Sequence, residues 1–361
     1  PPKFGLHGLS SKSKFLAVAV SSMINNRKII EDTFNEINIQ CVFRENNVSL
    51  WNDETSSFKY MPIDYLNSNI EYQNEYNNQN YDEIIDCSCV LFSDNKPIAL
   101  WPITLARKNK VNFLISPGQY PPILPPIFNT NCAKKTSKRL YKQAYSVLNK
   151  ISLANHISEW HTSTSYMGLT GLDDWHLLCM KKGASCSVIH NLYVDLKKDL
   201  EKIKLDFRKS YRPLVTKGDR IWTTKIHTSS IDLDTWKEFK NLHLKAAGII
   251  TRSDESWNIQ YRIIIEDRGF LVSIYDEKAK MVGGALIVFS ANESRYESAA
   301  YDRNLFDMPL GHLVQFKAIE ESKKRDFDYY FLGRRFFESD KPKPTKKEIS
   351  ISEFKEGFAT Y

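Results

Sequence analysis

The sequence predicts two similar α+β domains, each a mostly antiparallel sheet with helices on its faces. With 361 residues the chain is long for a single hydrophobic core. Its content of 42% hydrophobic and 26% charged residues is typical of a soluble globular protein. The third observation is an internal similarity: residues 90–105 and 272–287 both read as a strand, an acidic turn and a second strand. Together these observations favour a duplicated architecture.

In the first half, Asp94-Asn95 lies between two β-branched runs, which predicts the tip of a hairpin. The pattern then predicts a strand, a proline-studded loop, an amphipathic helix and a strand, at residues 112–116, 117–126, 135–154 and 156–161. The apolar run 15–20 is shorter than the core of a signal peptide, so we interpret it as a buried strand. The rest of residues 1–50 is not assigned.

The second half repeats this order. Apolar residues at near-helical spacing predict a helix over 234–247, and the second hairpin follows it. Next come a strand, a loop, a helix and a strand, at residues 295–301, 304–310, 312–324 and 327–332. We expect a basic helix at 197–217 near the junction of the domains. In the tail, Ile349 and Ile351 alternate with serines and predict a strand. The expected domains are 1–190 and 191–340, followed by the strand segment 341–361.

The formal net charge of +7 favours an anionic partner, although the bias is modest for this length. Six cysteines without a C-x-x-C pair are interpreted as reduced core thiols, and no metal site is expected. No apolar run approaches the 18 residues of a transmembrane helix. The basic region 197–217 reads as a solvated face, with contact to a diphosphate, a lipid-linked carrier or tRNA as the alternative.

Four segments together resemble the FemAB-like transferases, which carry two tandem GNAT-type domains. They are LYVDLKKDLEKIKLDFRKSYRPLVTKG, NLHLKAAGIITRSDESW, ESAAYDRNLFDMPLGHLVQFKAIEESKKRDFDYYFLG and ISEFKEGF, at 192–218, 241–257, 297–333 and 351–358. The resemblance covers residues 190–361, whereas the first half matches only in architecture. It implies acyl transfer, and it implies that the terminal strand returns to the first domain and places Lys355 near a bound anionic substrate. The alternative is an edge strand with a solvated lysine.

The resemblance also directs attention to the loop before the helix at 312–324, where acyl-CoA users cradle a diphosphate. Here the stretch is FDMPLGH, with Gly311 as its only glycine between Leu310 and His312. These three residues are the candidate cofactor-binding residues. The single glycine departs from the Gly-rich pattern, as in relatives that take aminoacyl groups from tRNA. Gly311 could equally serve backbone geometry alone.

His243, Arg252 and Trp257 form a second candidate group, because a helix ending at Gly248 places the following loop beside the hairpin. His243 is a candidate base and Arg252 a clamp for a carboxylate or phosphate. Trp257 is a candidate platform for a sugar or base. Each has a plain alternative, since a histidine beside apolar residues and a tryptophan more often belong to a core.

Three further residues complete the candidate set. Tyr301 ends the strand beside the parted centre expected of a GNAT-like sheet, and is a candidate proton donor to the leaving group. Arg334 ends the next strand at the same side of the sheet, and Tyr120 lies in the loop 117–126 that would wall an acceptor pocket. Tyr301 could instead be an ordinary tyrosine of the sheet, and the prolines around Tyr120 could simply terminate strands.

The sequence thus favours a cytoplasmic N-acyltransferase that moves an acetyl or other acyl group from acyl-CoA. The acceptor would be an amino group on a sugar or cell-surface precursor, either an anionic small molecule or a carrier-linked one. Aminoacyl-tRNA-dependent transfer, with tRNA as partner, is the alternative. A third hypothesis is a non-catalytic binding module that kept the fold and lost the donor site.

Overall fold

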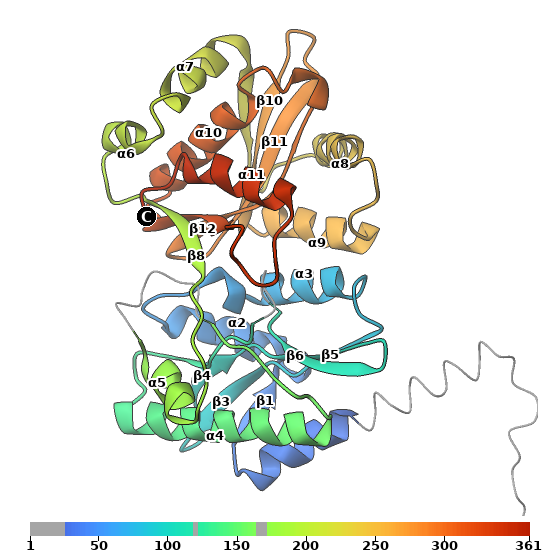
Figure 1. Cartoon of the computed structure of the whole chain (residues 1–361), viewed down its shortest axis with the longest axis vertical. Coiled ribbons are helices and arrows are strands. Elements are labelled where there is room, and N and C mark those ends of the chain that lie inside the picture. Colours follow the sequence, from blue (N-terminus) through green and yellow to red (C-terminus); the bar gives the residue numbers. More distant parts are fainter. Residues whose placement is uncertain (1–25, 118–121, 164–171) are drawn as a thin grey trace, which may run out of the picture. The chain divides into compact units, whose positions relative to one another are not determined.

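The computed structural model describes residues 26–117, 122–163 and 172–361, which form two compact units (Figure 1). The described part of the first unit comprises 26–58, 77–117, 122–163 and 172–183. The second unit comprises 59–76 and 184–361. The predicted strand at 15–20 and the candidate Tyr120 lie outside the described residues. Residues 59–76 thus group with the C-terminal part of the chain, although they precede the expected boundary by more than a hundred positions.

The first unit holds two small sheets and the helices that cover them. One sheet has the order β1-β3-β4-β7, formed by Cys41–Phe43, Cys89–Ser93, Lys96–Trp101 and Ile127–Phe128. The other has the order β2-β5-β6, formed by Glu83–Asp86, Thr104–Lys108 and Val111–Ile115. The helices are a stretch at 26–36, α2 (Val48–Glu54), α4 (Lys134–Ala154) and α5 (Asp174–Lys181). The core packs around the fully buried Trp101 and Trp175.

The predicted first-half hairpin is confirmed as β3 and β4. Asp94 and Asn95 both have positive φ, 53° and 59°, which a two-residue hairpin turn requires. The strand β6 and the helix α4 are also confirmed. The predicted strand at 156–161 is wrong, because no residue of this segment is in a strand, and only the next residue, Thr162, forms an isolated bridge, with Ile123. It lacks a neighbouring strand with which to form a ladder.

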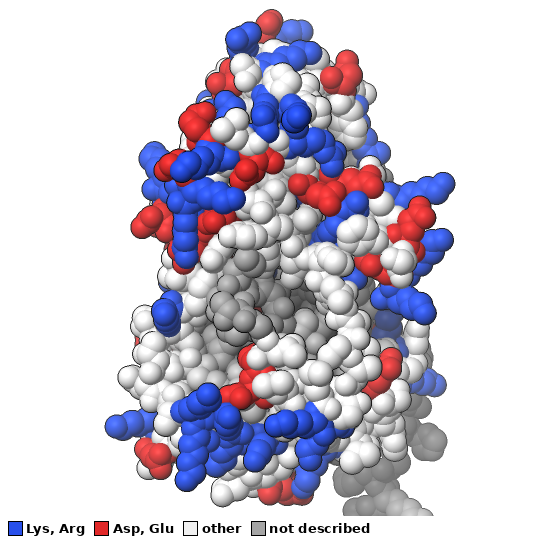
Figure 2. All heavy atoms as spheres, turned by 60° about the vertical axis from the view of Figure 1, so that its left-hand side comes forward, with Lys and Arg blue, Asp and Glu red and all other residues white. Residues whose placement is uncertain are grey.

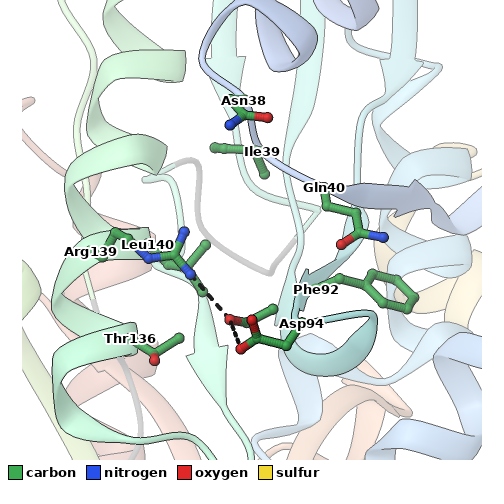
Figure 3. Close-up of a pocket in the computed structure, with 9 residues that line it drawn as sticks. Asn38, Ile39, Gln40, Phe92, Asp94, Thr136, Arg139 and Leu140 are labelled. Carbon is green, nitrogen blue, oxygen red and sulfur yellow. Dashed lines mark hydrogen bonds between the residues drawn. The ribbon is translucent and has the colours of Figure 1, made fainter.

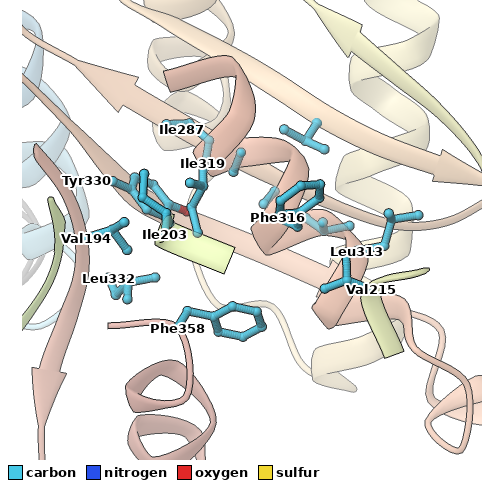
Figure 4. Close-up of a cluster of buried hydrophobic side chains, with 14 of the residues drawn as sticks. Val194, Ile203, Val215, Ile287, Leu313, Phe316, Ile319, Tyr330, Leu332 and Phe358 are labelled. Atoms are coloured by element: carbon cyan, nitrogen blue, oxygen red, sulfur yellow. The ribbon is translucent and has the colours of Figure 1, made fainter. Parts of the chain in front are cut away.

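The second unit is built on one sheet of order β8-β13-β12-β11-β10-β9. Its strands are His190–Asp195 (β8), Thr223–His227 (β9), Gly269–Tyr275 (β10), Met281–Phe289 (β11), Glu293–Tyr301 (β12) and Tyr329–Arg335 (β13). One face of the sheet is covered by α6 (Leu200–Asp206), α7 (Tyr211–Ile221) and α10 (Leu310–Lys324), whose apolar side chains form a common core with the sheet (Figures 1 and 4). The other face is covered by α3 (Asn67–Asn77), α8 (Leu233–Ala247) and α9 (Asp254–Ile265). The predicted second hairpin, helices and strands are present with small shifts in their ends.

At the centre of this sheet two parallel strands part. β12 and β13 pair through only three residues each, Glu293–Arg295 against Tyr329–Phe331. Beyond that point β12 continues to Tyr301 and β13 to Arg335 without pairing to each other. The parted pair of strands that the resemblance implies is therefore present.

A bulge in β12 decides which side chains face this gap. Along the ladder with β11, Ile287 pairs with Tyr296 and Leu286 with Ser298, so Glu297 is an extra residue. Side chains five positions apart on a regular strand point to opposite faces. The extra residue reverses that parity and brings Tyr296 and Tyr301 to the same face.

Two expectations about the second unit are wrong. The basic region 197–217 forms two helices, α6 and α7, and lies inside the second unit. The tail is a helix, α11 (Lys346–Glu356), which packs on β13 of the same unit. The signal for a helix was Thr345-x-x-Glu348, which forms a capping box in which each residue accepts a hydrogen bond from the other's backbone amide. The alternation of isoleucine and serine predicts a strand with a buried isoleucine face, but in the helix Ile351 is exposed and Ser352 is buried.

Candidate functional site

The helix α11 lies across the gap between β12 and β13 and is fixed at both sides. On the β13 side, the Ser352 hydroxyl accepts hydrogen bonds from the Phe336 amide and the Arg335 guanidinium, each at 3.1 Å. On the β12 side, the Lys355 ammonium lies 5.1 Å from the centre of the Tyr296 ring. One turn of α11 therefore places Lys355 over the parted strands.

Lys355 is a partly buried cation without a polar partner. Within the described part of the chain it forms no hydrogen bond and no ion pair, and its ammonium lies over the Tyr296 ring. Burial lowers the pKa of Lys355 to about 8, while the nearby Glu297 carboxylate acts in the opposite direction. At neutral pH the side chain is an ammonium ion that has lost water without gaining a counter-ion, which suits it to a ligand that brings negative charge.

Two tyrosines extend the site along β12. The hydroxyl oxygens of Tyr296 and Tyr301 are 3.1 Å apart. Burial raises the pKa of Tyr296 to about 12 and raises that of Tyr301 further above its ordinary value. Both phenols are therefore protonated at physiological pH and act as hydrogen-bond donors.

The first turn of α10 borders the same site and is covered by aromatic rings. A Cβ at Gly311 would lie 3.0 Å from the Phe354 ring and 3.6 Å from the Tyr301 ring. His312 packs edge-on against Tyr211 and Phe354, with ring centres 4.6 Å and 5.1 Å apart. Burial lowers the pKa of His312, which favours its neutral form.

This arrangement tests whether the residues suit an acyl-CoA. A diphosphate cradle needs open backbone amides or a nearby cation at the helix start. Here Leu310 is buried, the Phe354 ring would lie only 3.0 Å from a Cβ at Gly311, and burial favours the neutral form of His312 by lowering its pKa. The residues of the α10 N-terminus therefore do not fit the diphosphate of CoA.

The other candidate group lies on the opposite face of the sheet. Arg252 donates to the Tyr72 hydroxyl at 3.1 Å and to the Gln260 side-chain oxygen at 2.9 Å, and it stacks 4.6 Å from the Trp257 ring centre. His243 packs edge-on against Trp257 at 5.2 Å. Burial, with a contribution from Arg252, lowers the pKa of His243 to about 4. These side chains join α3, α8 and α9.

The structure therefore divides the predicted site residues. Tyr301, Gly311, His312 and Lys355 come together with Leu310 around the gap, whereas His243, Arg252 and Trp257 pack on the far face. Arg334, on β13, forms an ion pair with Asp340 at 3.3 Å and stacks on Phe336. The predicted role of each residue stays a prediction.

Sequence reasoning missed Tyr296, Tyr211 and Phe354. Phe354 directly precedes Lys355 in the F-K-x-G-F segment, so its proximity was open to inference. Tyr296 faces the site only because of the bulge at Glu297, and the local sequence gives no signal for that bulge. Tyr211 arrives from α7, more than eighty residues before α10, and contacts it only in the folded unit.

A network of buried charges ties residues 59–76 to β12. Arg295 pairs with Asp64 at 2.5 Å and with Glu297 at 2.9 Å, and it also donates to the Asn69 side chain. Glu293 accepts from the Tyr60 hydroxyl at 2.5 Å and from the Ile63 amide at 2.8 Å. Burial raises the pKa of Glu293 to about 7.

The first unit contains a surface pocket of 480 Å³ between α4 and the β3–β4 hairpin (Figure 3). Its one cation, Arg139, already donates to Ser93 at 3.1 Å and to Gln143 at 3.2 Å. The other polar lining residues are neutral apart from Asp94. Among the described residues no cluster of His, Cys, Asp and Glu could hold a metal ion. No described helix has the length and apolar character needed to cross a membrane.

No protein-family model matches the sequence, and no curated protein matches it. Several solved structures are similar in fold. FemX shares 12% identity at a TM-score of 0.58, over 86% of this chain and 92% of its own. A conserved protein of unknown function from Bacteroides thetaiotaomicron shares 8% identity at 0.53, over 89% and 97%. The C-terminal domain of a putative lysylphosphatidylglycerol synthetase from Agrobacterium fabrum shares 10% at 0.52, over 81% and 79%.

Identities this low establish the fold and leave the activity to be argued from the site. The α+β architecture, the parted strands β12 and β13 and the coverage of nearly all of FemX agree with one another. This chain therefore has the same fold as FemX.

Proposed function

We propose that the protein transfers an acyl group from an activated ester to an amino group, in the gap between β12 and β13. The observation that carries this proposal is Lys355, an ammonium ion held over the gap without a counter-ion. The fold shared with FemX and with part of a putative lysylphosphatidylglycerol synthetase supports the reaction class.

In the proposed reaction the amine nitrogen attacks the ester carbonyl carbon, and the carbonyl electrons move to oxygen. The resulting tetrahedral intermediate carries negative charge, which a nearby cation stabilises strongly in a water-poor site. The C–O bond of the ester then breaks, the departing oxygen gains a proton, and the amine loses one. Lys355 stabilises the oxyanion or the anionic part of the acceptor, and Tyr301 donates a hydrogen bond to the departing oxygen.

The covered start of α10 favours an aminoacyl ester of tRNA over acyl-CoA as the donor, since Phe354 fills the space beside Gly311. An ester of that kind is held through the nucleic acid and needs no diphosphate cradle. For the acceptor we propose an amino group on an anionic, nucleotide-linked or lipid-linked cell-envelope precursor. Activated donors of this class are made in the cytoplasm, so we place the reaction there.

The test is to replace Lys355 and measure transfer from a panel of aminoacyl-tRNAs to nucleotide-linked and lipid-linked amino acceptors. Lys355→Met should lower kcat by about 10²–10³-fold, the usual effect of losing one group that stabilises the oxyanion. The matched control is Lys347→Met, which removes an exposed lysine from the same helix and should leave the rate unchanged. Activity should also fall as pH rises through about 8, because Lys355 loses its charge there.

A second experiment measures the Tm of the protein with and without acetyl-CoA. A ligand at 100 times its Kd adds about 2.7 kcal/mol to the free energy of unfolding, so binding is readily seen as a rise in Tm. We expect no rise. A clear rise would contradict our choice of donor and restore acyl-CoA. Full activity in Lys355→Met would remove Lys355 from the mechanism, and absence of transfer from every donor would favour a binding module.

A further inference from the structure

The first unit carries a lysine-rich face beside exposed apolar side chains. The helix α4 contains five lysines and one arginine in 21 residues and no acidic residue. All five lysines are exposed, and Lys135, Lys138 and Lys142 lie along the outer side of the helix, opposite the buried stripe that includes Leu148. Figure 2 shows blue side chains gathered low on the visible face, over the unit that contains α4 and α5.

The neighbouring helix α5 adds apolar groups to this face. Trp175 and Cys179 point into the core, so Leu177 lies on the opposite side of the helix and is exposed, as is Met180 next to it. Lys138 of α4 pairs with Asp174 at 3.4 Å, and Asp174, Leu177 and Lys181 follow one another at helical spacing along one stripe. The lysine row of α4 therefore lies beside the exposed apolar stripe of α5.

The charge of this α4–α5 face is not neutralised. Among the described residues, only Lys138 of the three outer lysines of α4 pairs with a carboxylate, and Asp173 and Asp174 are the acidic residues of α5 and its cap. The basic region of the second unit is different, because its lysines alternate with acids and pair with them, as Lys198 does with Asp206 and Lys202 with Asp199. A face on which cations outnumber anions attracts an anionic partner.

We propose that the α4–α5 face docks the protein on the surface of an anionic lipid bilayer. Lysines beside a bilayer interact with its negative headgroups, and exposed leucine and methionine gain by entering the boundary between headgroups and acyl chains. The same alkyl groups gain nothing from the phosphate backbone of a nucleic acid. Single-stranded nucleic acid is usually bound by stacked aromatic rings, and this face exposes leucine, methionine, lysine and Arg139. This inference is independent of the proposed reaction, because its readout is binding alone.

The experiment is co-sedimentation of the full chain with vesicles. We expect the protein to bind vesicles that mix phosphatidylcholine with phosphatidylglycerol, and to remain in solution with phosphatidylcholine alone. Each lysine near an anionic surface contributes about a fivefold change in partition. The variant Lys135→Gln/Lys138→Gln/Lys142→Gln should therefore bind on the order of 100-fold more weakly.

The matched control removes three exposed lysines from the second unit, Lys202→Gln/Lys209→Gln/Lys217→Gln, and should bind as the native chain does. A second variant, Leu177→Ser/Met180→Ser, keeps every charge and should lose the binding that persists at high salt. All of these side chains are exposed, so the fold is preserved, which circular dichroism would verify.

Equal partition of the native chain into both kinds of vesicle would overturn the proposal, as would unchanged binding by the α4 variant. Fluorescence anisotropy with labelled tRNA tests the alternative that this face binds nucleic acid. If the α4 variant loses affinity for tRNA and keeps its affinity for vesicles, the face is a nucleic-acid surface and the lipid proposal is wrong.

Discussion

Arg295, which is buried, and Lys355, which is partly buried, lie on either side of the same stretch of β12 and differ in their contacts. Arg295 points to the face covered by residues 59–76 and is surrounded by Asp64, Asn69 and Glu297. Lys355 approaches from α11 on the other face and meets the Tyr296 ring without a carboxylate at ion-pair distance. Residues 296 and 297 of β12 therefore contact one cation each: Arg295 has carboxylate partners, and Lys355 has none among the described residues.

The difference shows that burial of a charge does not by itself identify a functional site. A buried ion pair whose hydrogen bonds are complete holds segments of the chain together, and removal of either partner is costly. A buried cation without a partner lowers stability, and the fold retains it although a plain apolar side chain would be more stable there. By this criterion Arg295 is structural, and we propose that Lys355 marks the site.

The largest effect expected from this comparison is on stability at Arg295. Arg295→Met should lower the free energy of unfolding by about 3–5 kcal/mol, because it leaves Asp64 and Glu297 buried without a counter-ion. Urea denaturation would measure it. An exposed ion pair provides the control: Lys197→Met, which removes the partner of Asp328, should cost about 1 kcal/mol or less. A similar small loss at Arg295 would contradict its structural role.

Lys355 should behave in the opposite way. Folding lowers its pKa from 10.5 to about 8, which corresponds to about 3 kcal/mol that the charged form loses on folding. Lys355→Met should therefore be more stable than the native chain at pH 7. Between pH 8 and 10.5 the unfolded native chain binds more protons than the folded one, so its stability rises with pH and the advantage of the variant shrinks.

Urea denaturation of both chains across this pH range is the measurement. An advantage for the Met variant that is constant with pH would show that charge is not its cause. A Met variant less stable than the native chain at pH 7 would mean that Lys355 has a partner in solution.

The smallest effect concerns the aromatic cover of α10. Gly311→Ala should lower stability by about 1–2 kcal/mol, since the new Cβ meets Phe354 at 3.0 Å. In the background of Phe354→Ala the clash is absent, and the same change should become neutral or stabilising because alanine favours helix. A double-mutant cycle measures the coupling. Additive effects would show that Phe354 does not close this space, and would reopen the question of a CoA diphosphate there.

The sequence itself determined the elements whose signals are local. The turn residues Asp94 and Asn95 specified a hairpin, apolar spacing specified α4 and α8, and the repeated order of elements specified two α+β halves. Lys355 was found because the segment around it resembles a family. The tail was misassigned although its capping residues, Thr345 and Glu348, were visible, because a short alternation of isoleucine and serine was given more weight.

Only the tertiary structure decided which candidates share a site. The sheet separates His243 and Arg252 from Tyr301 and Lys355, and a one-residue bulge at Glu297 brings Tyr296 beside Lys355. Residues 59–76 join the second unit through buried charges more than two hundred positions away in the sequence. Periodicity and capping act over a few residues, so they can be recognised in the sequence. Whether a buried charge finds a partner depends on which distant segments pack against it, and that is settled only when the whole unit has folded.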